Sequence, residues 1–262
     1  MAAGHHLRRT HEPPYPCLYR SLAAPAYRKT LLARALIEFF RTDERPVAGF
    51  DLDTMDPMLA RILPKFALHA DINDTRGQVA LFDELIVDDE KPKVVDVSAH
   101  AYETFFDLME QIDFATEAPR RSVEPVILYA ANSDALSVKS YDRLRNRFPR
   151  LTLAPVYNDG IMRGYNLRGE FPTTNVVALP LRIPILSPLL RTIVDAGPFS
   201  FAEFRRQPPQ GFPSHLEAEM NAWLKRVNLQ FREMELRLLL SSLRGTLLGR
   251  SERQRDPARP RA

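Results

Sequence analysis

The segment "KPKVVDVSA" (residues 91–99) decides the fold class of this chain. Three valines surround Asp96, and a short β-branched run of this kind is typical of a strand buried in a parallel sheet. Similar apolar runs recur along the chain, and helical patterns of about 10–15 residues separate them. This alternation favours an α/β fold with a mostly parallel sheet and helices on both faces.

The same patterns locate the individual elements. Strands are predicted at residues 16–23, 45–54, 91–99, 123–133, 151–159 and 175–184. Helices are predicted at residues 27–40, 56–66, 76–89, 101–115 and 134–148. Ser133 or Asp134 is the expected N-cap of the last of these helices.

After Pro213 the pattern becomes helical over residues 214–248, which predicts one long helix or a helical hairpin. This C-terminal helical extension is expected to pack on the sheet domain or on a partner. We therefore divide the chain into a disordered leader, an α/β domain, a C-terminal helical segment and a basic disordered tail, at residues 1–16, 17–205, 206–249 and 250–262.

Composition indicates a soluble globular protein, because 45% of the 262 residues are hydrophobic and 26% are charged. Cys17 is the only cysteine, which excludes an intramolecular disulfide and agrees with a reducing cytoplasmic location. The sequence has no apolar run long enough for a transmembrane segment, and its first 16 residues lack the apolar core of a secretory signal. Arginines in the last thirty residues predict a tail that contacts DNA, RNA or an acidic membrane, or one that only solubilises the chain.

Polar side chains follow several of the predicted strands. Asp51 and Asp53 end one strand, Asp96 lies within the next, and Asn158 ends a later one. Ligands of open parallel sheets bind at the carboxyl ends of the strands. A carboxylate within a β-branched run is costly to bury, so Asp96 requires a metal, a basic group or a strand end. Asp51 and Asp53 have a simpler alternative, a strand-end turn, since alternation allows only one of them to face a given side.

Lys29 and Thr30 open a predicted helix, as the last two residues of a phosphate-binding loop do. Such a loop needs glycines, so that its backbone N–H groups can converge on the phosphates. The preceding "AAPAYR" (residues 23–28) has no glycine, and Pro25 has no N–H group. Lys29 and Thr30 are therefore also compatible with the solvated first turn of an ordinary helix.

The order of the segments nevertheless resembles a known family. "KTLLARALIEFF" is followed by "RPVAGFDLDTMDP", "PKVVDVSAHAYETFFDLMEQI" and "VEPVILYAANSDALSVKSYDRL". Over residues 15–205 this series is similar to the ParA/MinD-like P-loop ATPases, which carry a deviant Walker A loop. The resemblance implies a P-loop NTPase-like fold that binds ATP and Mg²⁺.

The resemblance also implies roles for individual residues. Lys29 would contact the β- and γ-phosphates, and Asn158 would face the base. Thr30 and Asp96 would hold Mg²⁺. Asp51 or Asp53 would lie near the attacking water. The chain would form a homodimer, bind DNA or a DNA-bound protein through its basic surface and tail, and act in DNA or plasmid partitioning, mobilisation or intracellular positioning.

The chain departs from the family pattern in the loop itself. The family's glycines fall on Ala23, Pro25, Ala26 and Arg28, and its additional lysine falls on Ala24. Phosphoryl transfer depends mostly on positioning and charge stabilisation, so we expect hydrolysis to be deficient. An altered reading frame over residues 1–28 would also explain the abrupt change of pattern at Lys29.

Two further hypotheses belong to other classes. The chain could be a non-catalytic scaffold on the same fold, which binds partners through its tail and its long C-terminal helix. It could instead be a Mg²⁺-dependent phosphoryl-transfer enzyme that uses Asp51, Asp53 and Asp96 as ligands, because carboxylates at strand ends can hold a hard cation.

Overall fold

The computed structural model describes residues 17–21, 26–160, 171–173 and 177–255. Seven strands form one sheet in the order β3-β2-β4-β1-β5-β6-β7, and each neighbouring pair is parallel. The predicted α/β class with a parallel sheet is thus confirmed. The strands are β1 (Cys17–Ser21), β2 (Ala48–Asp51), β3 (Ala67–His69), β4 (Lys93–Val97), β5 (Val126–Ala131), β6 (Thr152–Asn158) and β7 (Leu181–Ile183).

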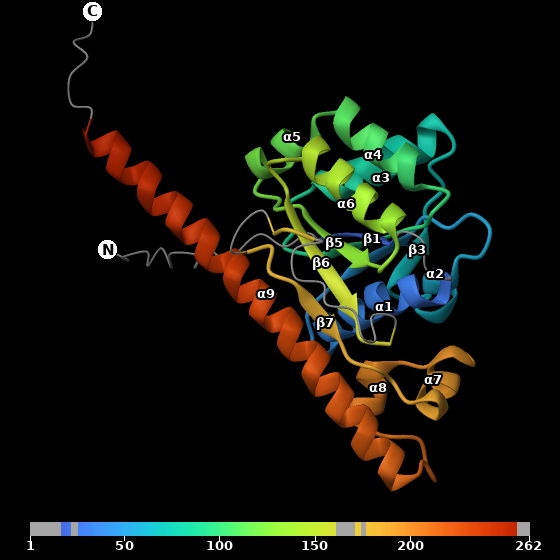
Figure 1. The fold of residues 1–262 in the computed structure, drawn as a ribbon. Coiled ribbons are helices and arrows are strands. Elements are labelled where there is room, and N and C mark those ends of the chain that lie inside the picture. The colour runs from blue at the N-terminus through green and yellow to red at the C-terminus, as the bar shows by residue number, and fades with distance from the viewer. Residues whose placement is uncertain (1–16, 22–25, 161–170, 174–176, 256–262) are drawn as a thin grey trace, which may run out of the picture.

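Helices cover both faces of this sheet (Figure 1). One face carries α3 (Thr75–Ile86), α4 (Tyr102–Gln111), α5 (Phe114–Arg120) and α6 (Ala135–Arg147). The other carries α1 (Ala26–Thr42), α2 (Met58–Ile62), α7 (Pro188–Asp195), α8 (Phe201–Arg206) and α9 (Ser214–Arg255).

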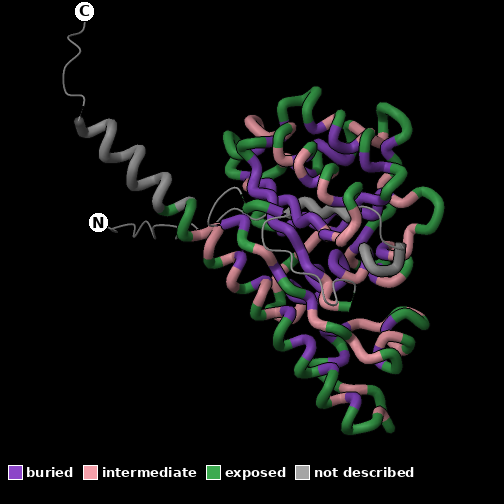
Figure 2. Tube along the Cα trace, in the orientation of Figure 1, coloured by how far each residue is buried: buried purple, intermediate pink, exposed green. Residues whose placement is uncertain are grey.

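Each face of the sheet has its own hydrophobic core. Val94 belongs to the core beneath α1, whereas Val95 and Val97 belong to the core beneath α4 and α6. This division follows from the alternation of side chains along a strand. Figure 2 shows buried residues along the central strands, on both sides of which these cores lie.

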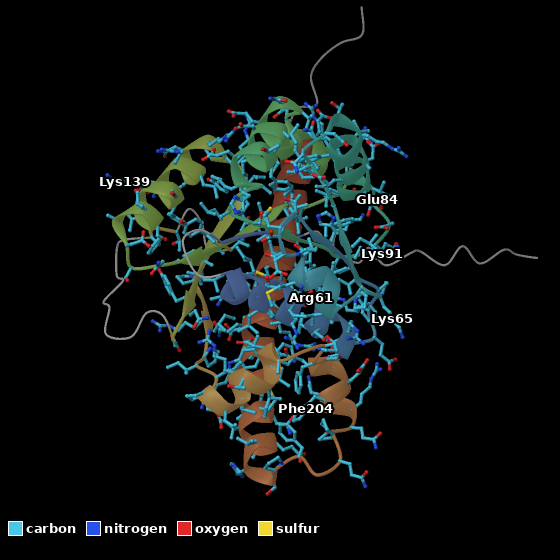
Figure 3. The ribbon with its side chains drawn as sticks, turned by 90° about the vertical axis from the view of Figure 1, so that its right-hand side faces the viewer. Arg61, Lys65, Glu84, Lys91, Lys139 and Phe204 are labelled. Carbon is cyan, nitrogen blue, oxygen red and sulfur yellow. The ribbon has the colours of Figure 1, made fainter. Side chains whose placement is uncertain are left out.

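Helix α1 is the most enclosed helix on its face, because other elements cover it on two sides. Leu36, Ile37 and Phe40 have no exposed surface. Phe39 contacts Phe231 of α9 at a ring-centroid distance of 5.6 Å. Below α1, the short helices α7 and α8 form a further layer, which includes Phe204 (Figure 3).

Some elements differ from the sequence predictions. Strand β3 was not predicted, because only one of its three residues is buried and it has no apolar pattern. The single helix predicted at residues 101–115 is divided into α4 and α5, since Asp113 adopts a left-handed conformation with φ of 48°. Helices α7 and α8 were not predicted either, although Ser187 and Ser200 cap them through their hydroxyl groups.

Other predictions are resolved by the structure. Asp134 is the N-cap of α6, where its carboxylate accepts a hydrogen bond from the backbone N–H of Ser137 at 2.6 Å. The C-terminal segment is one helix and not a hairpin, and it continues to Arg255, beyond the boundary expected at residue 249. Its buried residues Trp223 and Phe231 belong to the same core as α1.

A substitution at Gly49 of β2 tests how closely α1 approaches the sheet. A Cβ atom at this position would lie 2.7 Å from Ile37 Cδ1, 2.9 Å from Ala67 Cβ and 3.0 Å from the Phe66 carbonyl oxygen. We expect Gly49→Ala to lower the free energy of unfolding by about 1–3 kcal/mol, as overpacking does. Gly197→Ala is the matched control, since nothing lies within 4 Å of its added Cβ. Urea unfolding of both variants measures the difference, and equal stabilities would contradict the packing described.

Candidate functional site at the carboxyl edge of the sheet

Two of the predicted acidic residues lie side by side at the carboxyl edge of the sheet. Asp51 of β2 is in register with Asp96 of β4, so their backbones are about 4.8 Å apart. Phe50 and Val95 face the core beneath α4. By alternation, Asp51 and Asp96 therefore face the opposite side of the sheet, which α1 covers.

Asp96 lies close to the end of β4, and 7% of its surface is exposed. Its backbone carbonyl accepts a hydrogen bond from the N–H of Leu52 at 3.0 Å. Ser98 adds a second connection between these loops, because its hydroxyl donates to the carbonyl of Leu52 and accepts from the N–H of Ala101. The end of β4 is therefore fixed to the segment that follows β2.

The carboxylate of Asp51 holds the loop between β2 and α2. Oδ1 accepts from the backbone N–H of Asp53 at 3.0 Å, and Oδ2 accepts from that of Ala60 at 3.2 Å. Only 1% of the residue is exposed. Burial raises the pKa of Asp51, and the backbone hydrogen bonds oppose this rise. These contacts give Asp51 a structural role in this loop.

Asp53 closes a turn immediately after β2. Its Oδ1 accepts hydrogen bonds from the backbone N–H groups of Met55, at 3.0 Å, and Asp56, at 3.1 Å. An aspartate often stabilises a turn in this way, by bonding to its own following backbone. Asp53 thus follows the simpler of the two sequence readings, that of a strand-end turn.

Thr30 is one turn inside α1. The helix begins at Ala26, so the N–H of Thr30 lies beyond the unsatisfied N–H groups at the helix start. Thr30 is 8% exposed and lines a cavity of about 10 Å³ with Arg34 and Asp195. Residues 22–25 and the side chain of Lys29 lie outside the described residues.

Asn158 ends β6, on the same face of the sheet as α1. Its Oδ1 accepts a hydrogen bond from the N–H of Gly160 at 2.9 Å. Strands β1 and β5 separate β6 from β4 by about 14 Å, and the residue of β6 in register with Asp96 is Ala154, four residues before Asn158, so Asn158 lies more than about 14 Å from Asp96. Asp96, Asp51, Thr30 and Asn158 therefore share one face and one edge of the sheet, but they do not form one compact cluster.

The oxygen atoms of the predicted residues show which of them could hold Mg²⁺. Carboxylate and hydroxyl oxygens suit a hard cation, so Asp96 and Thr30 have the chemistry to hold Mg²⁺. Asp51 and Asp53 already bind backbone N–H groups. Among the residues that the structure describes, no group of three His, Cys, Asp or Glu side chains could hold a metal ion. This geometry does not fit the hypothesis that Asp51, Asp53 and Asp96 together bind Mg²⁺.

Two buried charges on α1 were missed by the sequence reading. Arg34 is 2% exposed and Glu38 is 1% exposed. They are the only charged residues between Thr30 and Phe40, one turn apart within an otherwise apolar segment. That interruption is the signal from which they could have been found, since charges are rarely fully buried unless they are paired.

Arg34 connects α1 with α7 and α8. Its Nη1 donates to the carbonyl of Val194 at 2.9 Å, and its guanidinium lies 4.7 Å from the ring centroid of Phe201. Burial lowers the pKa of Arg34 to about 10, while the charges of Glu38 and Asp195 oppose the shift. Within the described residues, Nε and Nη2 of Arg34 have no hydrogen-bond partner.

Glu38 fixes the start of α8. Its Oε2 accepts from Arg41 Nη1 at 2.8 Å, from the Ser200 hydroxyl at 3.1 Å and from the Ala202 N–H at 3.1 Å. Burial raises the pKa of Glu38, and the charge of Arg41 is the largest opposing effect. Thr30, Arg34 and Glu38, spaced four residues apart on one helix face, thus form a polar column from the sheet edge to α8.

A comparison with models of known protein families finds no match, and a comparison with curated proteins also finds none. Within the described part of the chain, no helix combines the length and the apolar character that crossing a membrane requires.

Removing the Glu38 carboxylate should destabilise the protein strongly. Glu38→Ala leaves Arg41 and Arg34 without their buried counter-charge, so we expect a loss of about 3–5 kcal/mol in the free energy of unfolding. Glu203→Ala is the control, because Glu203 also pairs with Arg41, at 3.6 Å, but its side chain is 72% exposed. That loss should be below about 1 kcal/mol. Chemical denaturation checks both values, and similar losses would refute a special role for Glu38.

The raised pKa of Asp51 should make the stability of the protein depend on pH. Its folded pKa is raised above the ordinary 3.8, so its contribution is complete below 3.8 and is lost as pH rises through the folded pKa. Asp51→Asn removes this titration. We therefore expect the unfolding free energy of the variant to fall less steeply than that of the parent between about pH 4 and pH 7. Parallel urea titrations at closely spaced pH values measure the two slopes, and identical slopes would exclude the raised pKa.

Proposed function

We propose that this chain is a ParA/MinD-like nucleotide-binding protein with deficient ATP hydrolysis. Mg-ATP would bind at the carboxyl edge of the sheet, where β1 precedes α1 and Asp96 lies close to the end of β4. The strand order supports this proposal, because β4 is the direct neighbour of β1 and Asp96 faces α1. The carboxylate and the start of the helix therefore lie on one side of the sheet, as phosphate and metal binding require.

The positive end of the α1 dipole adds to this support. A helix N-terminus attracts anions through its unsatisfied N–H groups and its partial positive charge. Helix α1 has 17 residues and begins beyond the carboxyl end of β1. Phosphate groups at that position would be attracted by the helix, while Asp96 and Thr30 supply oxygen atoms for Mg²⁺. When bound, Mg²⁺ would neutralise phosphate charge.

Deficient hydrolysis follows from the residues available to activate water. Both carboxylate oxygens of Asp51 accept hydrogen bonds from backbone N–H groups, and Asp53 holds its own turn. A general base must reach the proton that it removes, and the backbone hydrogen bonds of Asp51 and Asp53 hold both carboxylates in their own loop. The sequence before Lys29 also lacks the glycines that position phosphates. The protein would thus act in partitioning, mobilising or positioning DNA as a nucleotide-dependent binder.

The remaining parts of this proposal rest on the resemblance. They are ATP-dependent homodimerisation, a cytoplasmic location, and binding to DNA or a DNA-bound protein through the basic tail. A non-catalytic scaffold on the same fold is the second candidate. Asp51 and Asp53 both accept hydrogen bonds from the backbone of the loop that follows β2, which favours the scaffold. A scaffold needs this edge of the sheet to be ordered but does not need a reactive carboxylate there.

Calorimetric titration with Mg-ATP distinguishes these two candidates. We expect binding weaker than about 10 µM, because the glycine-rich cradle is missing and each charge-assisted contact contributes about 1.5–3 kcal/mol. Asp96→Ala should weaken the binding by about tenfold or more. Asp83→Ala, which removes an exposed carboxylate from α3, is the matched control and should leave the affinity unchanged.

Three outcomes would count against the proposal. No heat of binding at millimolar Mg-ATP would leave the scaffold as the function. Equal affinities of the parent and Asp96→Ala would remove Asp96 from the site. Steady release of phosphate over many turnovers would contradict deficient hydrolysis.

A further inference from the structure

The free edge of the sheet at β3 borders a groove. Strand β3 is the outermost strand on its side of the sheet (Figure 1). A groove of about 400 Å³ lies between this strand and α3, and that volume is within the range of ligand-binding pockets. Its apolar walls include Phe50, Leu68, Ala80 and Leu81, and polar side chains border them. We call this cavity the β3–α3 groove.

The backbone of β3 has hydrogen-bonding groups that face away from the sheet. The carbonyl of Phe66 and the N–H of Ala70 bond to β2. Because backbone groups alternate in direction along a strand, those of Ala67 and His69 face away from β2. The N–H of Ala67 donates to the carbonyl of Leu63 instead. The carbonyl of Ala67 and both backbone groups of His69 therefore lie at the free edge, with which no further strand of the described residues pairs.

Leu68 gives this edge an apolar centre. It is in register with Phe50, which belongs to the core beneath α4, so Leu68 faces the same side of the sheet. Its exposed fraction is 66%. Proteins commonly protect an edge strand by a charged side chain. An exposed leucine beside open backbone groups instead marks a surface to which another strand can add.

Helix α3 forms the other wall of the groove, and its length matches a short strand. Arg76, Ala80 and Glu84 line the groove at intervals of four residues, so they lie along one face of the helix. From Arg76 to Glu84 the helix rises by about 12 Å. A strand of about five residues has a length of about 13 Å. Such a strand, added to β3, would direct alternate side chains into the groove along its whole length.

The charges along the groove indicate what kind of strand it fits. Asp71 and Asp74 lie at the end that follows β3, and Glu84 lies toward the other end. Arg76 is the basic residue of the lining. Asp71 and Asp74 each accept one backbone N–H through Oδ1, and within the described part of the chain no ion pair engages these four side chains. Three carboxylates against one guanidinium make the groove acidic.

This charge disfavours other occupants of the groove. Nucleic acid and acidic membrane surfaces are negatively charged, so the carboxylates repel them. Two copies of the chain paired through their β3 edges would bring two acidic linings together, which disfavours association. An extended segment with Lys or Arg has the complementary charge.

We propose that the β3–α3 groove binds an extended basic segment of another protein, which adds to β3 as a further strand. The backbone of the segment pairs with Ala67 and His69, and an apolar side chain covers Leu68. A Lys or Arg two residues to either side of it faces the carboxylates. The groove lies on the opposite face of the sheet from α1, so this interaction goes beyond the proposed nucleotide site.

A synthetic peptide tests the proposal with the full chain. The probe is acetyl-Lys-Thr-Val-Thr-Lys-amide, because Thr and Val favour a strand and its alternate side chains match the groove. The control peptide has Glu in place of both Lys residues. NMR titration of isotope-labelled protein measures affinity and location. We expect shift changes in β3 and α3 that weaken with salt, and binding at least about tenfold weaker for the Glu peptide.

Hydrogen exchange at His69 distinguishes strand addition from attraction by charge alone. The backbone N–H of His69 faces away from β2, so an added strand in either direction gives it an acceptor. We therefore expect exchange of this N–H to slow when the Lys peptide saturates the protein. Charge attraction without strand pairing would leave its exchange rate unchanged.

Variants of the chain locate the binding face. Glu84→Lys should weaken binding of the Lys peptide by about fivefold or more, because it reverses a charge in the groove. Asp83→Lys is the matched control, since Asp83 is an exposed neighbour on α3 outside the lining, and it should change the affinity by less than about twofold. Leu68→Ser should weaken binding by about fivefold or more, because it removes the apolar centre. Circular dichroism checks that the folds are equal.

Several results would overturn the proposal. One is no binding of the Lys peptide at millimolar concentration, and another is equal binding of the two peptides. A third is that Glu84→Lys weakens binding no more than Asp83→Lys does. Unchanged exchange of the His69 N–H at saturation would exclude strand addition. A dimer of the chain that Leu68→Ser abolishes in sedimentation would assign the groove to a second copy instead.

Discussion

The burial of α1 on two sides is the constraint on which the rest of the structure depends. The sheet covers one side of the helix, and α7, α8 and α9 cover the other. Its two central charges therefore cannot reach water, and each must find its partners within the protein. Arg34 donates a hydrogen bond to the carbonyl of Val194 in α7 and lies over the ring of Phe201. Glu38 accepts hydrogen bonds from Arg41 and from the backbone N–H of Ala202 at the start of α8. These polar contacts add to the apolar packing of Leu190, Val194, Phe201 and Phe204, which holds α7 and α8 against α1.

The same helix links this layer to the candidate site. Its N-terminus points to the carboxyl edge of the sheet, where Asp51 and Asp96 face it from neighbouring strands. Asp51 uses its carboxylate to hold the loop beside α1, while Asp96 lies near the end of β4, next to the central strand β1. The Asp51 carboxylate thus orders this edge, and Asp96 is the residue that we propose as a ligand. The proposed nucleotide site depends on this division of roles.

The fold was predictable because its signals are local. The valines around Asp96 and the alternating helices identify a parallel sheet without any knowledge of distant contacts. Strand β3 and the break at Asp113 lack such signals, because three residues and one left-handed conformation leave little trace in a pattern. Alternation left open whether Asp51 or Asp53 faces α1, and only the register and order of the strands place Asp51 and Asp96 on that side. The partners of Arg34, Glu38 and Asp51 were not predictable, because each lies on an element that only the tertiary fold brings near.

Amide hydrogen exchange with and without Mg-ATP tests the central claim most directly, that the junction of β1, β4 and α1 is the nucleotide site. Exchange reports local opening, so a bound ligand slows it where the ligand contacts or orders the backbone. We predict slower exchange at residues 26–30, in the first turns of α1, and at residues 93–98, at β4, while α9 is unaffected. Unchanged exchange in both segments at millimolar Mg-ATP, or slowing confined to other parts of the chain, would contradict the account.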